Sequence, residues 1–225
     1  MENSQVVDYY NNIADDYDNS RFNNSYGQFI DAVERRILDG LVDATAPTRR
    51  LEMACGTGRL TNYATHGLDA SSEMMAHAQK RHPEVVFREA SACATGFSDA
   101  EFDLVYTFHL LMHLDEATIQ QIFDEAWRIL KPGGRFILDV PSKKRRHLLG
   151  KKRANWHGST SLTTDEVLAM AAGKFELRSS HGIMMLPVHK LPVGLRGKMV
   201  NLDFAMANGV LKDYSSYLVY ELVKK

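Results

Sequence analysis

Residues 51–58 combine the side chains that most clearly suggest ligand binding in this chain. A short apolar run carries one acid, Glu52, and then breaks into a turn with two glycines one residue apart, Gly56 and Gly58. Glycine lets a backbone approach a ligand closely and tolerates the positive φ of tight turns. A strand that passes through such a turn presents free backbone N–H groups to the space above it. The stretch therefore predicts a nucleotide-type pocket at the carboxyl end of a parallel strand.

The same residues argue against two common phosphate-binding loops. No third glycine follows Gly58 in the register of the dinucleotide fingerprint, and Arg59 and Leu60 stand where a P-loop needs lysine and serine or threonine. Glu52 lies four positions before Gly56, and its negative charge would repel a phosphate there. A ligand that carries ammonium and sulfonium groups fits this acid better.

A second carboxylate, Asp69, ends the next predicted strand, around residues 66–68. A carboxylate at the tip of the second strand of such a sheet is placed to accept hydrogen bonds from both hydroxyls of a ribose. The alternative is that Asp69 is a solvated turn residue or a helix cap. The helix predicted next, over residues 73–81, can be capped by Ser71 or Ser72. Two ligand groups at neighbouring strand ends favour the binding role.

The run from Glu52 to Gly58 resembles the first motif of class I S-adenosylmethionine-dependent methyltransferases, acidic-x-G-x-G-x-G, with Ala54 in place of the first glycine. The resemblance covers roughly residues 9–140 and is to the small-molecule, methyltransferase type 11-like branch. It implies S-adenosyl-L-methionine as the cofactor. The implied activity is methyl transfer to oxygen or nitrogen of a small-molecule substrate.

The resemblance also implies a set of cofactor-binding positions. Ser91 and Ala92 follow the third predicted strand, where related enzymes hold the adenine edge; Ser91 replaces the usual acid, but its hydroxyl can still accept a hydrogen bond. Tyr17 and Arg21 resemble residues of N-terminal helices that cover the cofactor; they reach the methionine carboxylate or are ordinary surface residues. The implied set comprises Tyr17, Arg21, Glu52, Ala54, Cys55, Gly56, Thr57, Asp69, Ala70, Met74, Ser91, Ala92, Thr107 and Phe108.

Two histidines, His109 and His113, follow the fourth predicted strand. In the methyltransferases that the chain resembles, this turn flanks the sulfonium and the incoming substrate. Imidazole titrates near neutrality, so either residue is a candidate general base for a hydroxyl acceptor. Each can equally be a capping or packing residue.

Positioning these side chains requires strands that alternate with helices, and the hydrophobic pattern predicts that alternation. The predicted helical regions are 5–46, 59–63, 73–81, 117–130, 165–172 and 195–207. After the strand that leads into the glycine turn, further strands are predicted near 66–68, 85–87, 102–107, 135–140, 175–186 and 217–223. The order predicts an α/β fold with a doubly wound, mostly parallel sheet. The resemblance adds a Rossmann-like arrangement of seven strands, with an antiparallel C-terminal edge and helices on both faces.

Length and composition limit the remaining possibilities. The chain has 225 residues, of which 44% are hydrophobic and 24% charged, which suits one domain. We divide it into an N-terminal helical cap (1–46), a cofactor-binding core (47–140) and a C-terminal substrate-side half (141–225). The net charge of −1 gives no global attraction to nucleic acid or to an anionic membrane. No apolar stretch reaches the roughly 18–20 residues of a membrane helix. We expect neither nucleic acid nor membrane as a partner, and a monomer or homodimer.

The termini and cysteines favour a cytoplasmic protein. Residues 1–4 lack the basic-then-apolar order of a secretion signal. The two cysteines, Cys55 and Cys93, lack the spacing of a metal site, so we expect reduced thiols and no metal.

A basic run at 143–146, continued at 151–153, has two interpretations: a solvated loop, or a site for a phosphate- or nucleotide-linked substrate. Other functions stay open. A non-catalytic S-adenosylmethionine-binding protein would keep Glu52, Gly56 and Asp69 but lack an acceptor pocket. A nucleic-acid methyltransferase is disfavoured, because no Asn/Asp-Pro-Pro-aromatic tetrapeptide follows the fourth strand and no Pro-Cys pair supplies a nucleophile. An NAD-linked oxidoreductase is disfavoured further by the missing glycine.

Overall fold

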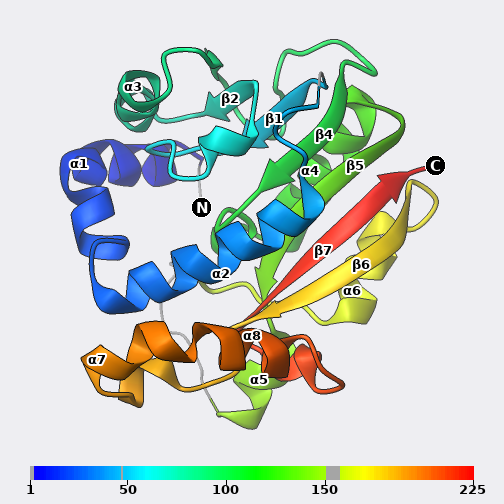
Figure 1. Cartoon of the computed structure of the whole chain (residues 1–225). Coiled ribbons are helices and arrows are strands. Elements are labelled where there is room, and N and C mark those ends of the chain that lie inside the picture. Colours follow the sequence, from blue (N-terminus) through cyan, green and yellow to red (C-terminus); the bar gives the residue numbers. More distant parts are fainter. Residues whose placement is uncertain (1–2, 47, 151–157) are drawn as a thin grey trace.

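The computed structural model describes residues 3–46, 48–150 and 158–225, which form a seven-stranded sheet with helices on both faces (Figure 1). The strand order is β3-β2-β1-β4-β5-β7-β6. Strands β1 to β5 run parallel, whereas β7 is antiparallel to both β5 and β6. The predicted doubly wound, mostly parallel sheet with an antiparallel C-terminal edge is therefore confirmed.

The predicted strands are all present, with ends that differ by a few residues. They are β1 (Arg50–Met53), β2 (His66–Asp69), β3 (Val86–Glu89), β4 (Phe102–Thr107), β5 (Leu130–Pro141), β6 (Phe175–Ile183) and β7 (Tyr217–Lys224). The α-helices are α1 (Asn3–Arg21), α2 (Ser25–Leu41), α3 (Ser72–Arg81), α4 (Glu116–Ile129), α5 (Lys143–Leu148), α6 (Thr164–Ala171), α7 (Val193–Arg196) and α8 (Val200–Ala207).

The predicted N-terminal helical region is two helices rather than one. Helix α2 begins after Asn24, whose side chain accepts hydrogen bonds from the N–H groups of Tyr26 and Gly27. The chain turns so tightly that a Cβ on Gly27 would lie 2.0 Å from the carbonyl oxygen of Arg21. This break lets α2 pack on the sheet while α1 turns away toward α3 (Figure 1).

The predicted helix after the glycine turn is wrong in type. Only a 3₁₀ turn, η1 (Thr61–Tyr63), separates the glycines from β2, because too few residues remain there for a helix and its return. Helix α2 covers this face of the sheet instead. Its side chains Phe29, Val33 and Leu38 pack in one core cluster with Leu60.

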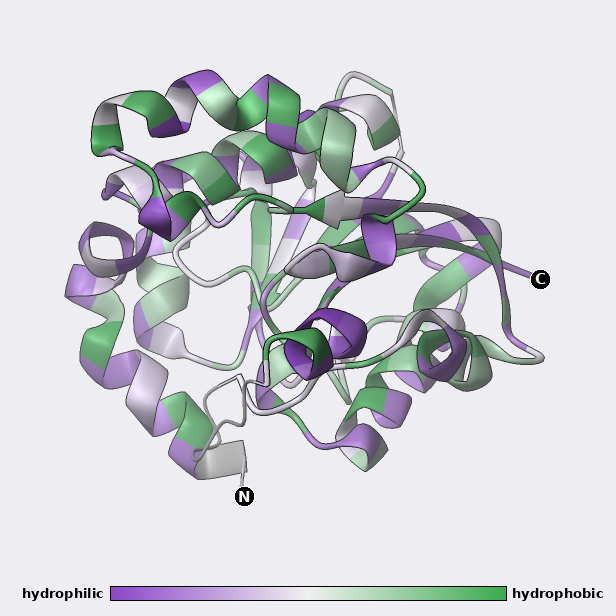
Figure 2. Ribbon diagram, turned by 90° about the horizontal axis from the view of Figure 1, so that it is seen from below, coloured by the Kyte–Doolittle hydropathy of each residue, from purple (hydrophilic) through white to green (hydrophobic). Residues whose placement is uncertain are grey.

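Helices α4 and α6 cover the opposite face. Ile122, Phe123 and Val167 are buried there in one cluster with Phe136 of β5. On the first face, α7 and α8 pack along α2 and form an outer row (Figures 1 and 2). Among the described residues, no helix combines the length and apolarity that crossing a membrane requires.

Candidate functional site

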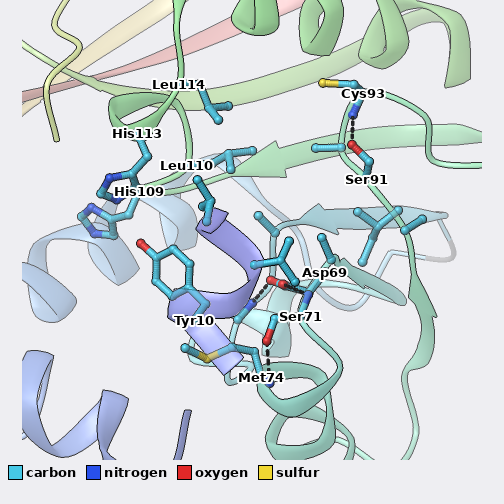
Figure 3. A pocket seen from close by; sticks show the side chains of 18 of the residues that line it. Tyr10, Asp69, Ser71, Met74, Ser91, Cys93, His109, Leu110, His113 and Leu114 are labelled. Atoms are coloured by element: carbon cyan, nitrogen blue, oxygen red, sulfur yellow. Dashed lines mark hydrogen bonds between the residues drawn. The ribbon is translucent and has the colours of Figure 1, made fainter. Parts of the chain in front are cut away.

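A cavity of about 450 Å³ opens at the carboxyl ends of β1, β2 and β4 (Figure 3). A smaller space of about 50 Å³ adjoins it, and both are lined by Tyr17, Ala54, Gly56, Phe108 and His109. The larger cavity is also lined by Val6, Val7, Asp8, Tyr10, Leu68, Asp69, Ala70, Ser71, Met74, Ala90, Ser91, Ala92, Cys93, Leu110, His113, Leu114, Thr118 and Ile122. Its position is the one that the glycine turn predicts.

The turn after β1 takes a left-handed backbone at three positions. The φ angles are 55° at Ala54, 54° at Gly56 and 80° at Gly58. A Cβ on Gly58 would lie 3.0 Å from Cα of Ala78 in α3, whereas a Cβ on Gly56 would meet no atom within 4 Å. Ala54 thus adopts the conformation of the family's glycine with a side chain attached, which costs about 1–2 kcal/mol.

Asp69 ends β2 and faces the cavity. One carboxylate oxygen accepts a hydrogen bond from the N–H of Gly56 at 2.7 Å, and the other from the N–H of Ser71 at 2.9 Å (Figure 3). A carboxylate has about four acceptor positions, so capacity for further donors is left. Burial raises the pKa of Asp69. The group is therefore fixed in direction and suited to a neutral diol.

Helix α1 is joined to the site mainly by polar contacts. Asn11 accepts a hydrogen bond from Ser71 at 2.6 Å, and Asp18 accepts one from Thr57 of the glycine turn at 2.6 Å. Asp18 also pairs with Arg81 of α3 at 2.5 Å. These contacts hold one side of the cavity closed.

Glu52 lies in β1 beneath the smaller space and is buried. One of its oxygens accepts a hydrogen bond from the Thr61 hydroxyl at 2.5 Å. Burial raises the pKa of Glu52 to about 8. The acid is thus largely protonated at neutral pH until a cation approaches.

His109 sits between two acids at the end of β4. Its Nε2 lies 2.7 Å from Oε1 of Glu34, and its Nδ1 lies 3.6 Å from Asp139. The contact with Glu34 is an ion pair, but its geometry does not meet the criteria for a hydrogen bond. Its backbone N–H donates to Asp139 at 2.7 Å, and its φ is 60°. Glu34 also binds Arg59 at 2.6 Å.

The charges of this cluster are strongly coupled. Burial opposes ionisation of Glu34, but His109 and Arg59 lower its pKa to about 2. Burial would lower the pKa of His109, yet Glu34 and Asp139 raise it overall. Burial raises the pKa of Asp139 to about 6. The two acids therefore favour the protonated form of His109.

His113 has a different environment. Its Nδ1 accepts a hydrogen bond from the N–H of Gly158 at 3.0 Å. A neutral imidazole that accepts at Nδ1 carries its proton on Nε2, so this side chain is placed to donate rather than to accept. The hydroxyl of Tyr10 points toward both histidines (Figure 3).

The structure brings most of the residues in the predicted set to the two spaces. Tyr17, Ala54, Gly56, Asp69, Ala70, Met74, Ser91, Ala92 and Phe108 line the larger cavity, as do His109 and His113, and Glu52, Cys55 and Thr57 line only the smaller space. Arg21 lines neither, and its guanidinium donates to the Tyr9 hydroxyl at 3.4 Å. Thr107 also lines neither, because it is fully buried. Both cysteines are free thiols.

The basic run at 143–146 is helix α5, and each of its cations has a partner in the protein. Lys143 pairs with Glu166, and Lys144 pairs with Asp213 at 2.5 Å. The guanidinium groups of the two arginines donate to backbone carbonyls, including those of Met185, Ser159 and Thr160. None of the four lines either space. Their contacts do not favour the phosphate interpretation, and residues 151–153 lie outside the described ranges.

Sequence reasoning missed Glu34, Arg59 and Asp139. Glu34 interrupts the apolar stripe of α2, and Asp139 interrupts the apolar run of β5. A lone acid within an apolar run predicts either a partner or a function, because an isolated buried charge is costly. That signal was present, but it does not identify the partner.

The fold and the cavity define a protein with a Rossmann-like sheet and a nucleotide-type pocket at its strand ends. The family model described as "Methyltransferase domain" matches residues 51–138. This part of the chain is similar to class I S-adenosylmethionine-dependent methyltransferases, as the motif around the glycine turn predicts.

Similar proteins share this core. An uncharacterized methyltransferase of Synechocystis sp. is 35% identical over 94 residues, which cover 39% of this chain and 44% of that protein. A demethylmenaquinone methyltransferase of Tropheryma whipplei is 29% identical over 152 residues, covering 64% of this chain and 62% of that protein. The chain thus spans less than half the length of the Synechocystis relative.

A solved structure agrees over nearly the whole chain. A possible histamine N-methyltransferase of Thermotoga maritima matches with a TM-score of 0.71 at 18% identity, covering 96% of this chain and 98% of that one. At this identity the match supports the fold alone.

Proposed function

We propose that the chain binds S-adenosyl-L-methionine and transfers its methyl group to nitrogen or oxygen of a small molecule. The observation that carries this proposal is Asp69, an oriented and half-buried carboxylate with unused acceptor capacity at the edge of a cavity of about 450 Å³. The cavity has the size range of a small-molecule or cofactor site.

The residues present fit the proposed cofactor. Asp69 would accept hydrogen bonds from the ribose hydroxyls, and Met74 and Leu110 would form apolar walls for the adenine. Gly56 lacks the Cβ that would project toward this space. Glu52 would face the ammonium group, which would also favour its ionised form.

The bound cofactor would supply an electrophilic methyl group on a sulfonium. The protein's part is to align the acceptor and exclude water, because positioning supplies much of the rate of a bimolecular displacement. Apolar and aromatic side chains of α1 and of the turn after β4 line the cavity for this purpose.

We assign the acceptor's proton to His109 rather than His113. Nε2 of His109 lies against Glu34 at 2.7 Å, so the proton would go to Nδ1, which lies 3.6 Å from Asp139, too far for a hydrogen bond. An imidazole oriented by a carboxylate is a common base arrangement. Because the two acids raise the pKa of His109, the proposed base should lose its proton at a higher pH than an ordinary histidine does, and the rate should increase with pH through that titration.

We keep the division into three functional segments that the sequence predicts: a cap over residues 1–46, a cofactor-binding core over 47–140 and a substrate-side half over 141–225. Related proteins support the proposed activity. One structurally similar chain, a phosphoethanolamine N-methyltransferase of Haemonchus contortus with S-adenosylhomocysteine bound, covers 100% of this chain and 50% of its own at a TM-score of 0.66 and 16% identity. The name of that enzyme is consistent with a nitrogen acceptor.

Calorimetry of the purified protein with S-adenosylmethionine and S-adenosylhomocysteine tests cofactor binding. Asp69→Asn should weaken binding about 10-fold to 100-fold for each hydrogen bond lost, since bonds to charged groups contribute about 1.5–3 kcal/mol. Asp16→Asn, on the exposed side of α1, is the matched control and should bind normally. Absence of binding to the wild type at millimolar ligand would overturn the proposal.

A second experiment separates an enzyme from a non-catalytic binding protein. The protein is incubated with methyl-labelled S-adenosylmethionine and a small-molecule extract. Labelled product supports methyl transfer. Cofactor binding without labelled product in extracts rich in amines and alcohols would favour the binding protein instead.

A further inference from the structure

The segment between β6 and β7 leaves an unusual number of apolar side chains exposed. Of the thirteen large apolar residues that the described chain exposes, seven lie within residues 193–214. Val210 is fully exposed, and Val193 and Leu211 are more than 60% exposed. Monomeric proteins seldom leave so many apolar side chains together without a use.

Helix α8 shows why this surface is not ordinary packing. Asp203 and Ala207 face inward and are buried, whereas Leu202 and Met206, four positions apart on the neighbouring outer side, are exposed. A helix that is apolar on both sides is normally buried on both sides. The outer side of α8 therefore lacks its expected cover among the described residues.

The unpaired charges on this segment are positive. Lys190, Lys198 and Lys212 form no ion pair with the described residues. The acids of the segment are not available to balance them, because Asp203 is buried and Asp213 pairs with Lys144. The whole-chain net charge of −1 hides this local excess of positive charge.

We propose that the face formed by residues 187–214, which include α7 and α8, docks on an anionic lipid surface. Apolar side chains enter the boundary between headgroups and acyl chains, while lysines beside them contact anionic headgroups. The face lies on the outer row of helices, where α7 and α8 lie outermost and hydrophobic residues recur (Figure 2). Peripheral contact of this kind needs no membrane-crossing helix and does not depend on the proposed methyl transfer.

The charge pattern favours a lipid surface over a second copy of the chain. In a twofold dimer the same face meets itself, so Lys190, Lys198 and Lys212 would approach their own counterparts without acids between them. An anionic bilayer supplies the complementary charge. A partner also needs apolar depth for Val210 and Leu211, which nucleic acid does not offer.

Flotation with vesicles tests the proposal on the full chain. Wild-type protein should float with phosphatidylcholine vesicles that contain about one third phosphatidylglycerol, and several-fold less with pure phosphatidylcholine or in high salt. Each lysine near the membrane surface increases partitioning to anionic vesicles about fivefold, equivalent to about 1 kcal/mol. Lys198→Glu with Lys212→Glu should therefore reduce partitioning at least 25-fold, taken as roughly fivefold per lysine.

The apolar side chains have a separate test. Val210→Asp with Leu211→Asp should abolish flotation without lowering the unfolding temperature, because both side chains are exposed. Val86→Asp on β3 and Lys80→Glu on α3 change exposed residues at the other edge of the sheet and should float as the wild type does.

Two results would overturn the proposal. One is failure of the wild type to float with anionic vesicles at millimolar lipid. The other is a dimer in sedimentation velocity that the Val210→Asp, Leu211→Asp variant converts to a monomer, which would assign the face to a second copy.

Discussion

Glu34→Gln should lower the free energy of unfolding by about 3 kcal/mol between pH 5 and 6.5. Glu34 is fully buried, between Arg59 and His109. Its pKa is about 2 in the folded protein against an ordinary 4.5, and each unit of difference corresponds to about 1.4 kcal/mol. Burial leaves little solvent to screen the pair, so no large discount applies.

The sign of the pH dependence follows from both partners. The lowered pKa of Glu34 gives stability that is present above pH 4.5 and is lost as the pH falls toward 2. The raised pKa of His109 gives stability that is present below pH 6.5 and is lost as the pH rises through the raised value. These are two views of one interaction, so the energy counts once, and the interval between pH 4.5 and 6.5 carries all of it.

Urea unfolding of the wild type and Glu34→Gln at about pH 3, 5.5 and 9 measures this gap. We expect the gap to be largest at pH 5.5 and to shrink by more than half at pH 3. Glu176→Gln, exposed on β6, should stay within about 0.5 kcal/mol of the wild type. A gap below about 1 kcal/mol at pH 5.5, or one of equal size at every pH, would refute the reasoning.

Activity gives a readout that a purely structural role would leave unmoved. Without the carboxylate beside Nε2, the pKa of His109 falls, so the rising limb of the rate against pH should move about one to three pH units toward acid. A lower rate with an unmoved limb would mean that Glu34 only supports the fold.

Two further predictions concern β1 and its turn. Ala54→Gly relieves the left-handed strain of φ 55° and should stabilise the protein by about 0.5–1 kcal/mol after the entropy cost of glycine. As a control, Ala169→Gly, inside α6, should destabilise the protein by about 1 kcal/mol. Denaturant unfolding measures both changes. Glu52, with a pKa of about 8, should lose its proton when the cationic cofactor binds near pH 7, so the binding heat should vary with the ionisation heat of the buffer in the wild type but not in Glu52→Gln. Equal heats in all buffers would contradict this.

The sequence predicts the sheet well because its signals are local. An apolar run between turn residues defines β4 to the residue, and a cap followed by helical spacing defines α3 within one. The antiparallel C-terminal edge came from the resemblance, since periodicity does not order strands, and the place of β7 between β5 and β6 was not predicted. The helix after Gly58 was mispredicted because α2, a segment distant in sequence, covers that face of the sheet instead.

In the candidate site, too, features with local sequence signals were predicted and features that depend on distant segments were not. Asp69 and Gly56 were predictable because backbone geometry at adjacent strand ends brings them together. The ion pairs of His109 were not, since they join Glu34 of α2 and Asp139 of β5 to a turn after β4. Arg21 failed to reach the cavity because α1 ends there and the chain turns into α2. Long-range side-chain partners require the packing of helices on the sheet, which spacing along one chain does not specify.

The acids around the cavity explain which kind of ligand it suits. Burial raises the pKa of Glu52, Asp69 and Asp139, so each ionised carboxylate costs the ligand-free fold some stability at neutral pH. Glu34 differs because Arg59 and His109 compensate its charge. Of these three, Glu52 and Asp69 line the two spaces, whereas Asp139 lines neither and lies beside His109. Two acids with raised pKa values at the cavity are better explained by a ligand than by folding, since neutral side chains would pack there at lower cost. A ligand with positive charge beside Glu52 lowers the pKa of that acid, and its affinity should therefore increase with pH up to about 8.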